Sequence, residues 1–429
     1  MSKTPIARAV AMATLGSSCI IPALAHADFI SDSKATVELR NFYFNRDFRS
    51  STPAQQNKAE EWAQGFILRY ESGYTEGTIG VGVDAIGMLG LKLDSSPDRV
   101  GTGLLPKPPA GKSAPDDYSK LGMTAKLRYE KNVVKVGTLT PKLPVIVPND
   151  SRLLPQVFLG SAINSTQLDG LTFDAGRLNQ TNLRDSSDYQ EMAITSGGKK
   201  NITFRSGTTT NEFNFAGGTY NWTKNFSTGY HYGQLDDFYK QHYLTLGWTL
   251  PITDGQSLKS DVRWAKSTDD GTSNVDNKAL NAMFTYNLGF HAFGLGYQKM
   301  SGDTGFAYIN GTDPYLVNFV QINDFANKDE KSWQARYDYN FAGIGIPGLT
   351  FMTRYVKGDN IDLLTPGAGD GKEWERDTDI AYVFQEGALK GLGVKWRNAT
   401  TRSDFSQNTA NSNSADENRL IVSYTMPLW

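Results

Sequence analysis

The sequence is poor in cysteine, histidine and long apolar runs, and each shortage removes a class of protein. Its single cysteine, Cys19, lies in the first 27 residues, so the rest of the chain has no disulfide and no cysteine metal site. Three histidines, His231, His242 and His291, remain beyond that segment. No later apolar run approaches the ~18 residues that a membrane-spanning helix needs. The composition therefore argues against a disulfide scaffold and against a helical membrane protein.

The first 27 residues have the three parts of a secretory signal peptide. Lys3 and Arg8 provide positive charge, residues 9–24 form an apolar stretch, and Ala25-His26-Ala27 resembles a cleavage site. We expect cleavage after Ala27 and a single unit over 28–429. Without the two basic residues of the signal, 41 basic and 45 acidic residues give a formal net charge of −4. Such mild acidity argues against a nucleic-acid partner.

Alternation with a period of two residues dominates the rest of the chain. In "KLGMTAKLRYEKN" one row holds Leu121, Met123 and Leu127, and the other row holds Lys126 and Arg128. The same pattern recurs in "EWAQGFILRYESGY", "SWQARYDYNF", "LTFMTRYVKG", "GLGVKWRN" and "RLIVSYTMPLW". With 20 Tyr, 22 Phe and 42 Gly, the composition suits many short strands better than helices. We predict an all-β protein.

The connections between these strands are of two kinds. Tight turns are predicted at 130–132, 223–225, 253–256 and 287–291, the third with an Asp-Gly hairpin signal. Long polar connections are predicted at 95–117, 143–168, 302–331 and 357–374. Short turns at one end and long loops at the other are typical of a bacterial outer-membrane barrel. A barrel also lets lipid cover the apolar rows, whereas β-sandwiches would show breaks every ~100 residues.

In such a barrel the polar rows line a water-filled lumen. Rows of fixed Arg and Lys favour anions, because a carboxylate gains charge-assisted hydrogen bonds from successive basic groups. The simpler reading is that these charges balance acidic neighbours and keep the lumen wet, although we expect the remaining acids to lie mainly in loops. The basic residues expected on the polar rows are Arg40, Arg69, Lys126, Arg128, Arg263, Arg336, Arg354, Lys395 and Arg397.

Several long segments resemble the porin D (OprD) family, the substrate-specific outer-membrane channels of Gram-negative bacteria. They are "LRNFYFNRDFR", "SGYTEGTIGVGVDAIGMLGLKLD", "SRLLPQ", the stretch from "NGTDPYLVNF" through "LTFMTRYVKGDN", and "ENRLIVSYTMPLW". The resemblance runs through the whole mature chain. It implies a monomeric barrel of about 18 strands whose loops fold inward to form a constriction, located in the outer membrane.

The resemblance also implies a site and a solute class. The family's third loop matches 143–168 and its seventh loop matches 302–331, which brings Arg152, Asp313 and Tyr315 to the constriction. The family takes up small carboxylate-bearing solutes, and this chain looks more like the branch for aromatic or cyclic monocarboxylates than the branch for basic amino acids. The expected partners are outer-membrane lipid, small organic anions and the barrel assembly machinery, and the expected state is a monomer or a weak trimer.

One feature departs from the usual pattern of these barrels, which end in an aromatic residue on the lipid-facing row. Here Leu428 is in phase with that row, and Trp429 is one step off beside Pro427. We expect the phase to reset at the proline.

A soluble exported hydrolase or binding protein is the alternative from another class. The residue counts alone leave a Ser/His/Asp triad open, but no G-x-S-x-G or H-E-x-x-H motif is present. "GIGIPG" at 343–348 matches a dinucleotide fingerprint but leads through Pro347 into a strand, so we interpret it as a turn. "AGKSAP" at 110–115 lacks the first glycine of a phosphate loop. We predict no catalytic residue, no cofactor, no metal and no enzymatic activity.

Overall fold

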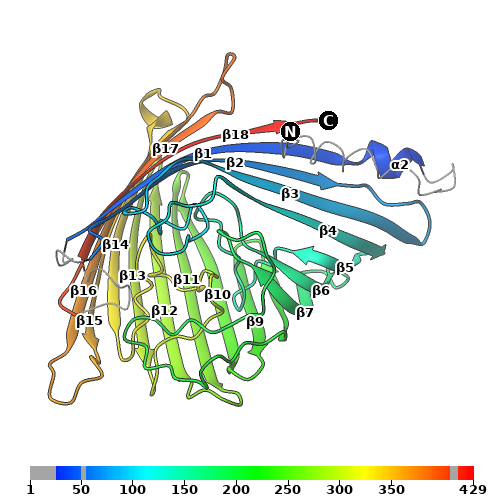
Figure 1. Cartoon of the computed structure of the whole chain (residues 1–429). Helices are drawn as coiled ribbons and strands as arrows, with labels where there is room; N and C mark the ends of the chain where they lie inside the picture. The colour runs from blue at the N-terminus through cyan, green and yellow to red at the C-terminus, as the bar shows by residue number, and fades with distance from the viewer. Residues whose placement is uncertain (1–25, 50–54, 406–413) are drawn as a thin grey trace.

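The chain folds into a closed barrel of 18 antiparallel strands, as predicted. The structure is a computed structural model and describes residues 26–49, 55–405 and 414–429. Every strand pairs with its neighbour in sequence, and β1 pairs with β18 to close the sheet (Figure 1). The predicted signal peptide, except for its last two residues, lies outside the described part. No helix in the described ranges is long and apolar enough to cross a membrane.

The bounds of the strands and the two short helices are as follows. The first half of the chain contains α2 (His26–Ser31), β1 (Lys34–Phe48), β2 (Lys58–Glu71), β3 (Ile79–Ser95), β4 (Asp117–Tyr129), β5 (Asn132–Leu139), β6 (Val157–Ser165), β7 (Leu171–Asn182), β8 (Phe213–Thr223) and β9 (Phe226–Leu235). The second half contains β10 (Tyr239–Thr253), β11 (Gln256–Asp269), β12 (Asp276–Leu288), β13 (His291–Ser301), β14 (Lys331–Asn340), η1 (Phe341–Ile344), β15 (Leu349–Ile361), β16 (Gly371–Val383), β17 (Gly393–Ser403) and β18 (Ser414–Pro427).

Alternation along each strand separates a lipid-facing side from a lumen-facing side. On β4, Met123 is 61% exposed and Leu127 is 47% exposed, whereas Thr124 is 5% exposed and Lys126 is 6% exposed. Successive side chains of a strand point to opposite faces of its sheet. In a closed barrel the exposed apolar row therefore faces lipid, and the polar row faces the lumen.

The connections alternate between the two ends of the barrel. The predicted tight turns are present at 130–131, 224–225, 254–255 and 289–290. Gly255 and Gly289 have φ of 74° and 56°, a region that glycine enters at little cost. "GIGIPG" lies in the connection between β14 and β15, so its interpretation as a turn is confirmed. We call the long connections at the opposite end L2 (96–116), L3 (140–156), L4 (183–212) and L7 (302–330).

Three long connections differ from the sequence-based expectation. The predicted connection 357–374 is shorter in the structure, at 362–370, because β15 and β16 extend further than expected. The predicted loop 143–168 is wrong, because L3 ends at residue 156 and strand β6 follows it. The small and polar residues of "GSAINS" hide that strand in the sequence, although Phe158 is fully buried under the loops. L4 was not recognised as a long connection, because its short apolar pieces resemble strand segments. Instead, Met192 makes an isolated bridge to Thr210 within L4, and Ile194 makes one to Ile309 of L7.

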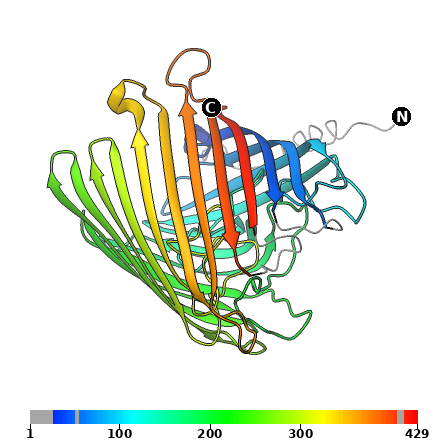
Figure 2. The ribbon, with the colours of Figure 1, turned by 90° about the vertical axis from the view of Figure 1, so that its left-hand side faces the viewer.

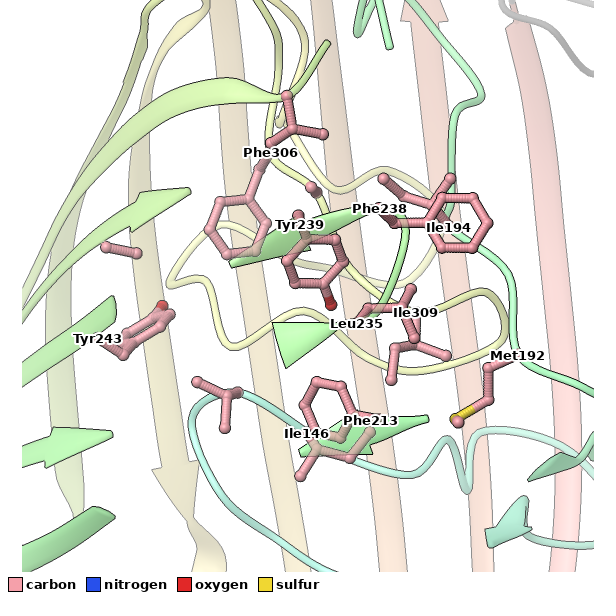
Figure 3. Packing of buried hydrophobic residues seen from close by; sticks show 14 of the residues in the cluster. Ile146, Met192, Ile194, Phe213, Leu235, Phe238, Tyr239, Tyr243, Phe306 and Ile309 are labelled. Atoms are coloured by element: carbon pink, nitrogen blue, oxygen red, sulfur yellow. The ribbon is translucent and has the colours of Figure 1, made fainter. Parts of the chain in front are cut away.

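The long loops fold back into the barrel and form an apolar core there. Ile146 of L3, Met192 of L4 and Ile309 of L7 pack with Phe213 and Tyr243, whose side chains come from the inner faces of β8 and β10 (Figure 3). A second cluster joins L2 and L3 to the inner faces of β1 to β4. The loops thus fill part of the lumen and fix the walls of any passage.

The start of β1 and the end of β18 meet at the short-turn end of the barrel. Strands β1 and β18 run side by side (Figure 1), and the indole Nε1 of Trp429 donates to the Ser33 hydroxyl over 3.0 Å. The Trp429 ring also lies 6.3 Å from the ring of Tyr70, whose row on β2 faces outward. Trp429 therefore contacts the outer surface although it is out of phase with β18, in line with the expected reset at Pro427.

Candidate functional site

The narrow part of the channel begins where L3 approaches the inner wall of β1. The Arg40 guanidinium on β1 binds the Asp150 carboxylate of L3 over 2.7 Å and donates to the Arg152 carbonyl over 2.8 Å. It also pairs with Glu38 over 2.6 Å. One arginine therefore ties the tip of L3 to the barrel wall. Arg152 itself is 7% exposed, and its Nε donates to the Thr102 carbonyl of L2 over 2.9 Å.

Asp313 of L7 joins L3 to L7 at the same level. Its carboxylate accepts a hydrogen bond from Asn149 Nδ2, and its N–H donates to the Val147 carbonyl over 2.9 Å. Arg184 of L4 donates to Asn149 Oδ1 over 3.0 Å, so three loops meet there. Burial raises the pKa of the Asp313 carboxyl to about 6, although the Asn149 hydrogen bond and the charges of Arg184 and Arg152 oppose the rise.

A buried arginine on the last strand holds both constriction loops at once. The Arg419 guanidinium donates to the Gln321 carbonyl of L7 over 3.1 Å and to the Ser151 carbonyl of L3 over 3.4 Å. It pairs with Glu417 over 2.5 Å, and Arg46 Nε donates to the same carboxylate over 2.7 Å. A charged group in so buried a place needs several partners, which these contacts supply.

Tyr315 of L7 faces the opposite wall of the barrel. The Arg263 guanidinium lies 3.8 Å from the centre of the Tyr315 ring, within the range of a cation–π contact. The Tyr243 hydroxyl donates to the Tyr315 carbonyl. Arg263 is also held by Asp261 over 2.6 Å. These contacts fix a flat aromatic ring beside a guanidinium on the inner wall.

All nine basic residues predicted on the polar rows have side chains on the inner side of the barrel. Eight of them pair with inner carboxylates, and Arg128 lies 4.3 Å from the centre of the Tyr74 ring. The ion pairs are Arg40 and Arg69 with Glu38, Lys126 with Asp84, Arg263 with Asp261, Arg336 with Asp338, Arg354 with Asp377, and Lys395 and Arg397 with Asp379. Their part in a solute path remains a prediction.

The expectation that acidic residues would lie mainly in loops is wrong. The carboxylates that pair with the predicted basic residues are themselves on the inner rows of the strands. A basic side chain two residues from an acid on one strand, as in Arg336 and Asp338, shares its face and can bind it. The two-residue alternation that places the basic side chains on the lumen-facing side therefore places these acidic side chains on that side too.

Sequence reasoning also missed inner basic residues. Lys135 on β5 binds Asp84 over 3.1 Å, and Arg46 and Arg419 bind Glu417. All three are on the inner row of their strand, so the same alternation could have found them. In the described ranges, no group of three or more His, Cys, Asp or Glu side chains is arranged to hold a metal ion.

Open space continues from the constriction towards the short-turn end. A cavity of about 700 Å³ lies beneath L3 and is lined by Arg69, Lys135 and Asp150 among others. A second cavity of about 580 Å³ shares Lys135 with it and adds Lys126 and Arg128. The larger cavity combines these charged side chains with apolar ones such as Leu139 and Phe215, whereas the smaller cavity is mainly polar and charged. A closed barrel with such a lumen is a channel of an outer membrane, and the arrangement offers passage rather than chemistry.

Comparison with known proteins defines the kind of channel. Residues 27–428 match the family described as "outer membrane porin, OprD family", and the chain belongs to that family. It is therefore a substrate-specific outer-membrane porin and not an enzyme.

The similarity to individual known proteins extends along nearly the whole chain. Porin D of Pseudomonas aeruginosa is 38% identical over 423 residues, which cover 93% of this chain and 92% of that protein. The crystal structure of Pseudomonas aeruginosa OpdQ is 71% identical, with a TM-score of 0.85 over 94% of this chain and 100% of that chain. The crystal structure of a BenF-like porin from Pseudomonas fluorescens Pf-5 is 39% identical, with a TM-score of 0.87 over 93% of this chain and 100% of that one.

Proposed function

We propose that this porin mediates passive uptake of small carboxylate-bearing solutes, aromatic or cyclic monocarboxylates in particular, along the basic residues of its inner wall. The observation that carries the proposal is a local excess of positive charge. Four inner carboxylates each serve two basic groups; Glu38 is one of them, but its partner Arg40 also has Asp150. At the other three places the basic groups have no second acidic partner. The three sets are Asp84 with Lys126 and Lys135, Asp379 with Lys395 and Arg397, and Glu417 with Arg46 and Arg419.

Each shared carboxylate leaves one positive charge uncompensated. The inner carboxyls of Glu61, Glu373 and Glu375 lie beneath the loops and are at most 2% exposed. Those of Glu71 and Asp174, in contrast, line the open cavities, so the excess of positive charge is local to the three shared carboxylates. A carboxylate entering the lumen meets basic groups that are already positioned by protein acids. It therefore loses little side-chain entropy in binding them, and it gains charge-assisted hydrogen bonds.

Aromatic surface near these charges favours solutes with a flat apolar body. Tyr315 beside Arg263 in the constriction and Tyr74 beside Arg128 near the exit each present a ring next to a guanidinium. A benzoate-like solute has the matching pair of features, because its ring can stack while its carboxylate binds the cation.

The test is selectivity in a planar bilayer under a salt gradient. We expect the wild-type channel to prefer anions, and the Lys395→Gln, Arg397→Gln double variant to lose most of that preference because Asp379 is left unpaired. The matched control is Arg376→Gln, which changes an exposed arginine on the outer row of β16 and should leave selectivity unchanged.

Cation preference of the wild-type channel, with faster passage of arginine than of benzoate into liposomes, would contradict the proposal. It would instead support a channel for basic amino acids, the other branch expected from the sequence. In that case the acidic groups of the lumen, such as Asp150 at the constriction, would dominate the field.

We also infer that the route to the membrane follows the sequence expectations. Residues 1–27 would direct export, and the barrel assembly machinery would recognise the last strand with its terminal Trp429. Heat-modifiable gel mobility in the outer-membrane fraction, compared with a chain that ends at residue 413, tests the need for β18.

A further inference from the structure

Six consecutive strands each carry one lysine on the outer face near the long-loop end. We call this set the basic belt. Its members are Lys266 on β11, Lys278 on β12, Lys299 on β13, Lys331 on β14, Lys357 on β15 and Lys372 on β16. Figure 2 shows the outer surface of several of these strands at the front of the barrel. Four of the six lysines are exposed, and the other two are half-buried.

Neighbouring lysines of the basic belt face one another across strands. Lys266 is directly opposite Lys278 in the β11–β12 register, and Lys299 is directly opposite Lys331 in the β13–β14 register. Like charges directly opposite each other destabilise a sheet. On its other side Lys331 is directly opposite Asp359 in the β14–β15 register but forms no ion pair with it, and its Nζ donates to Asn360 Oδ1 over 3.3 Å.

The basic belt has few acidic neighbours. None of its six lysines forms an ion pair within the described residues, and the segments that are not described contain no acidic residue. Asp276 and Asp359 share the same outer rim, so the lysines outnumber these carboxylates three to one. The protein thus leaves the charge of the basic belt mostly uncompensated.

An aromatic row fixes the depth of the basic belt in the membrane. Two residues deeper than the lysines, five of the six strands carry Trp264, Tyr297, Trp333, Tyr355 and Trp374. Three of these rings lie next to one another, with Trp333 5.6 Å from Tyr355 and Tyr355 5.7 Å from Trp374. Such girdles mark the boundary between hydrocarbon and headgroups. The lysines lie ~7 Å or less beyond it, which is the level of lipid phosphates.

Outer-face basic residues elsewhere along the same rim have partners within the protein. Arg402 on β17 pairs with Asp416 over 2.8 Å. Across the barrel, Arg177 on β7 pairs with Glu212 over 2.7 Å, and Lys58 on β2 pairs with Glu60 over 2.9 Å. Only the sector from β11 to β16 thus combines an aromatic girdle with a run of lysines that lack ion pairs in the described structure.

We propose that the basic belt binds the phosphorylated headgroups of outer-leaflet lipids. Phosphate at this depth supplies the anion that each opposed lysine pair lacks, and one phosphate can bridge two ammonium groups. The apolar tails of the same lipid lie against the aromatic girdle below. The site gives the porin a fixed lipid-binding sector on one side of the barrel, independent of the solute that passes through the lumen.

The experiment measures retention of diphosphoryl lipid A by the purified full-length barrel, using native mass spectrometry. The variant carries Lys278→Gln, Lys299→Gln, Lys331→Gln and Lys357→Gln. The control removes four exposed lysines of loops and turns in the same way, at Lys107, Lys112, Lys224 and Lys390. A lysine near an anionic surface contributes about fivefold to affinity. Losing four such contributions lowers the affinity by roughly two to three orders of magnitude, so we expect the belt variant to retain at least about tenfold less lipid and the control to match wild type.

Additional measurements distinguish binding of the lipid from binding of free phosphate, and loss of binding from misfolding. Wild type should retain diphosphoryl lipid A more strongly than its fully dephosphorylated form, and millimolar inorganic phosphate should not displace the lipid. Replacing the same four lysines by arginine should preserve retention, and heat-modifiable mobility should show that every variant is folded. Equal retention by the belt and control variants would overturn the proposal, and so would displacement of the lipid by inorganic phosphate.

Discussion

The inner wall and the basic belt place the same kinds of side chain in opposite circumstances. Inside, Lys395 and Arg397 share the Asp379 carboxylate. Outside, Lys299 faces Lys331 across the β13–β14 pair with no carboxylate between them. An internal acid holds a lumen cation in place and lowers the net charge that a moving solute meets, so the solute can bind and leave. The lysines of the basic belt form no ion pair in the described structure, although Asp359 is directly opposite Lys331, and this suits a partner that remains bound.

The largest effect should come from charge placed on the outer wall outside the basic belt. Met123 is near the middle of the apolar row of β4, whereas Leu127 lies beside Tyr129 at the short-turn end. Met123→Arg should cost ~2–4 kcal/mol, and Leu127→Arg should cost less, because the penalty falls towards the interface. Unfolding of the reconstituted barrel in urea, followed by heat-modifiable mobility, measures both.

The control for that prediction is an arginine on the inner side. Met352 lines a lumen cavity of about 400 Å³ that also contains Asp338 and Asp379, so Met352→Arg should be tolerated. Thr124 is a poor control, because it is buried and its hydroxyl donates to the Thr138 carbonyl. Equal losses for Met123→Arg and Met352→Arg would show that the inner and outer rows have been interchanged.

The second prediction concerns a buried acid that holds L7 to the wall. The Glu330 carboxyl accepts hydrogen bonds from the Asn327 backbone and side chain over 3.0 and 2.9 Å, and burial raises the pKa of Glu330 to about 7. A raised acid pKa stabilises the fold fully below the ordinary value of 4.5, and this contribution is lost as the pH rises through about 7.

The barrel should therefore be less stable at pH 8.5 than at pH 5, by roughly 1–3 kcal/mol from this group. Glu330→Gln keeps a neutral side chain of the same shape, so it should reduce that pH dependence, and the buried Glu373, which accepts from the same Asn327 amide over 3.1 Å, accounts for the remainder. Urea unfolding midpoints at the two pH values measure the effect. A pH dependence that is identical in wild type and Glu330→Gln would assign it to other groups.

The third prediction removes inner charge near the exit. Lys126→Gln with Arg128→Gln leaves Asp84 with Lys135 alone. We expect benzoate flux into liposomes to fall severalfold, because screening by water is weak in a confined lumen, while a neutral solute of similar size is little affected. The quadruple belt variant is the matched control, since it removes four outer charges and should not slow benzoate. Unchanged flux in the folded double variant would exclude these two residues from the path.

The smallest effect should come from reversing one charge of the basic belt. Lys278→Glu converts the like-charge pair with Lys266 into an attractive pair, which should stabilise the barrel by ~0.2–1 kcal/mol in a neutral detergent. In membranes containing diphosphoryl lipid A the same change should destabilise it, because a lipid contact is lost. Unfolding midpoints in the two media show whether Lys278→Glu stabilises or destabilises the barrel in each. A change in the same direction in both media would argue against a lipid ligand.

The barrel and its inner basic residues could be predicted because both follow from alternation along single strands. The row of Leu121, Met123 and Leu127 can be assigned to the lipid-facing side from its own alternation, without reference to distant residues. The tight turns could likewise be predicted from short local sequence signals. The basic belt obeys the same rule, but each strand contributes one lysine, and only the register of six strands brings them together.

The constriction could not be built from the sequence alone because its contacts are made between loops far apart in the chain. Asn149 and Asp313 are 164 positions apart, and nothing local to either residue indicates the hydrogen bond. The boundary of L3 was wrong for a related reason. Strand β6 is held by its neighbours and by loops above it, so its own small and polar residues carry little strand signal.

The closure of the barrel has a consequence for the aperture itself. Arg46 is on the first strand and Glu417 is on the last, so their ion pair spans the single seam between chain ends. Arg419, beside them on β18, holds both L3 and L7. Until β18 pairs with β1, neither loop has its hydrogen bond from Arg419. The pairing that closes the barrel therefore also places L3 and L7 on one shared arginine, beside the contacts that Arg40 and Asn149 already give these loops.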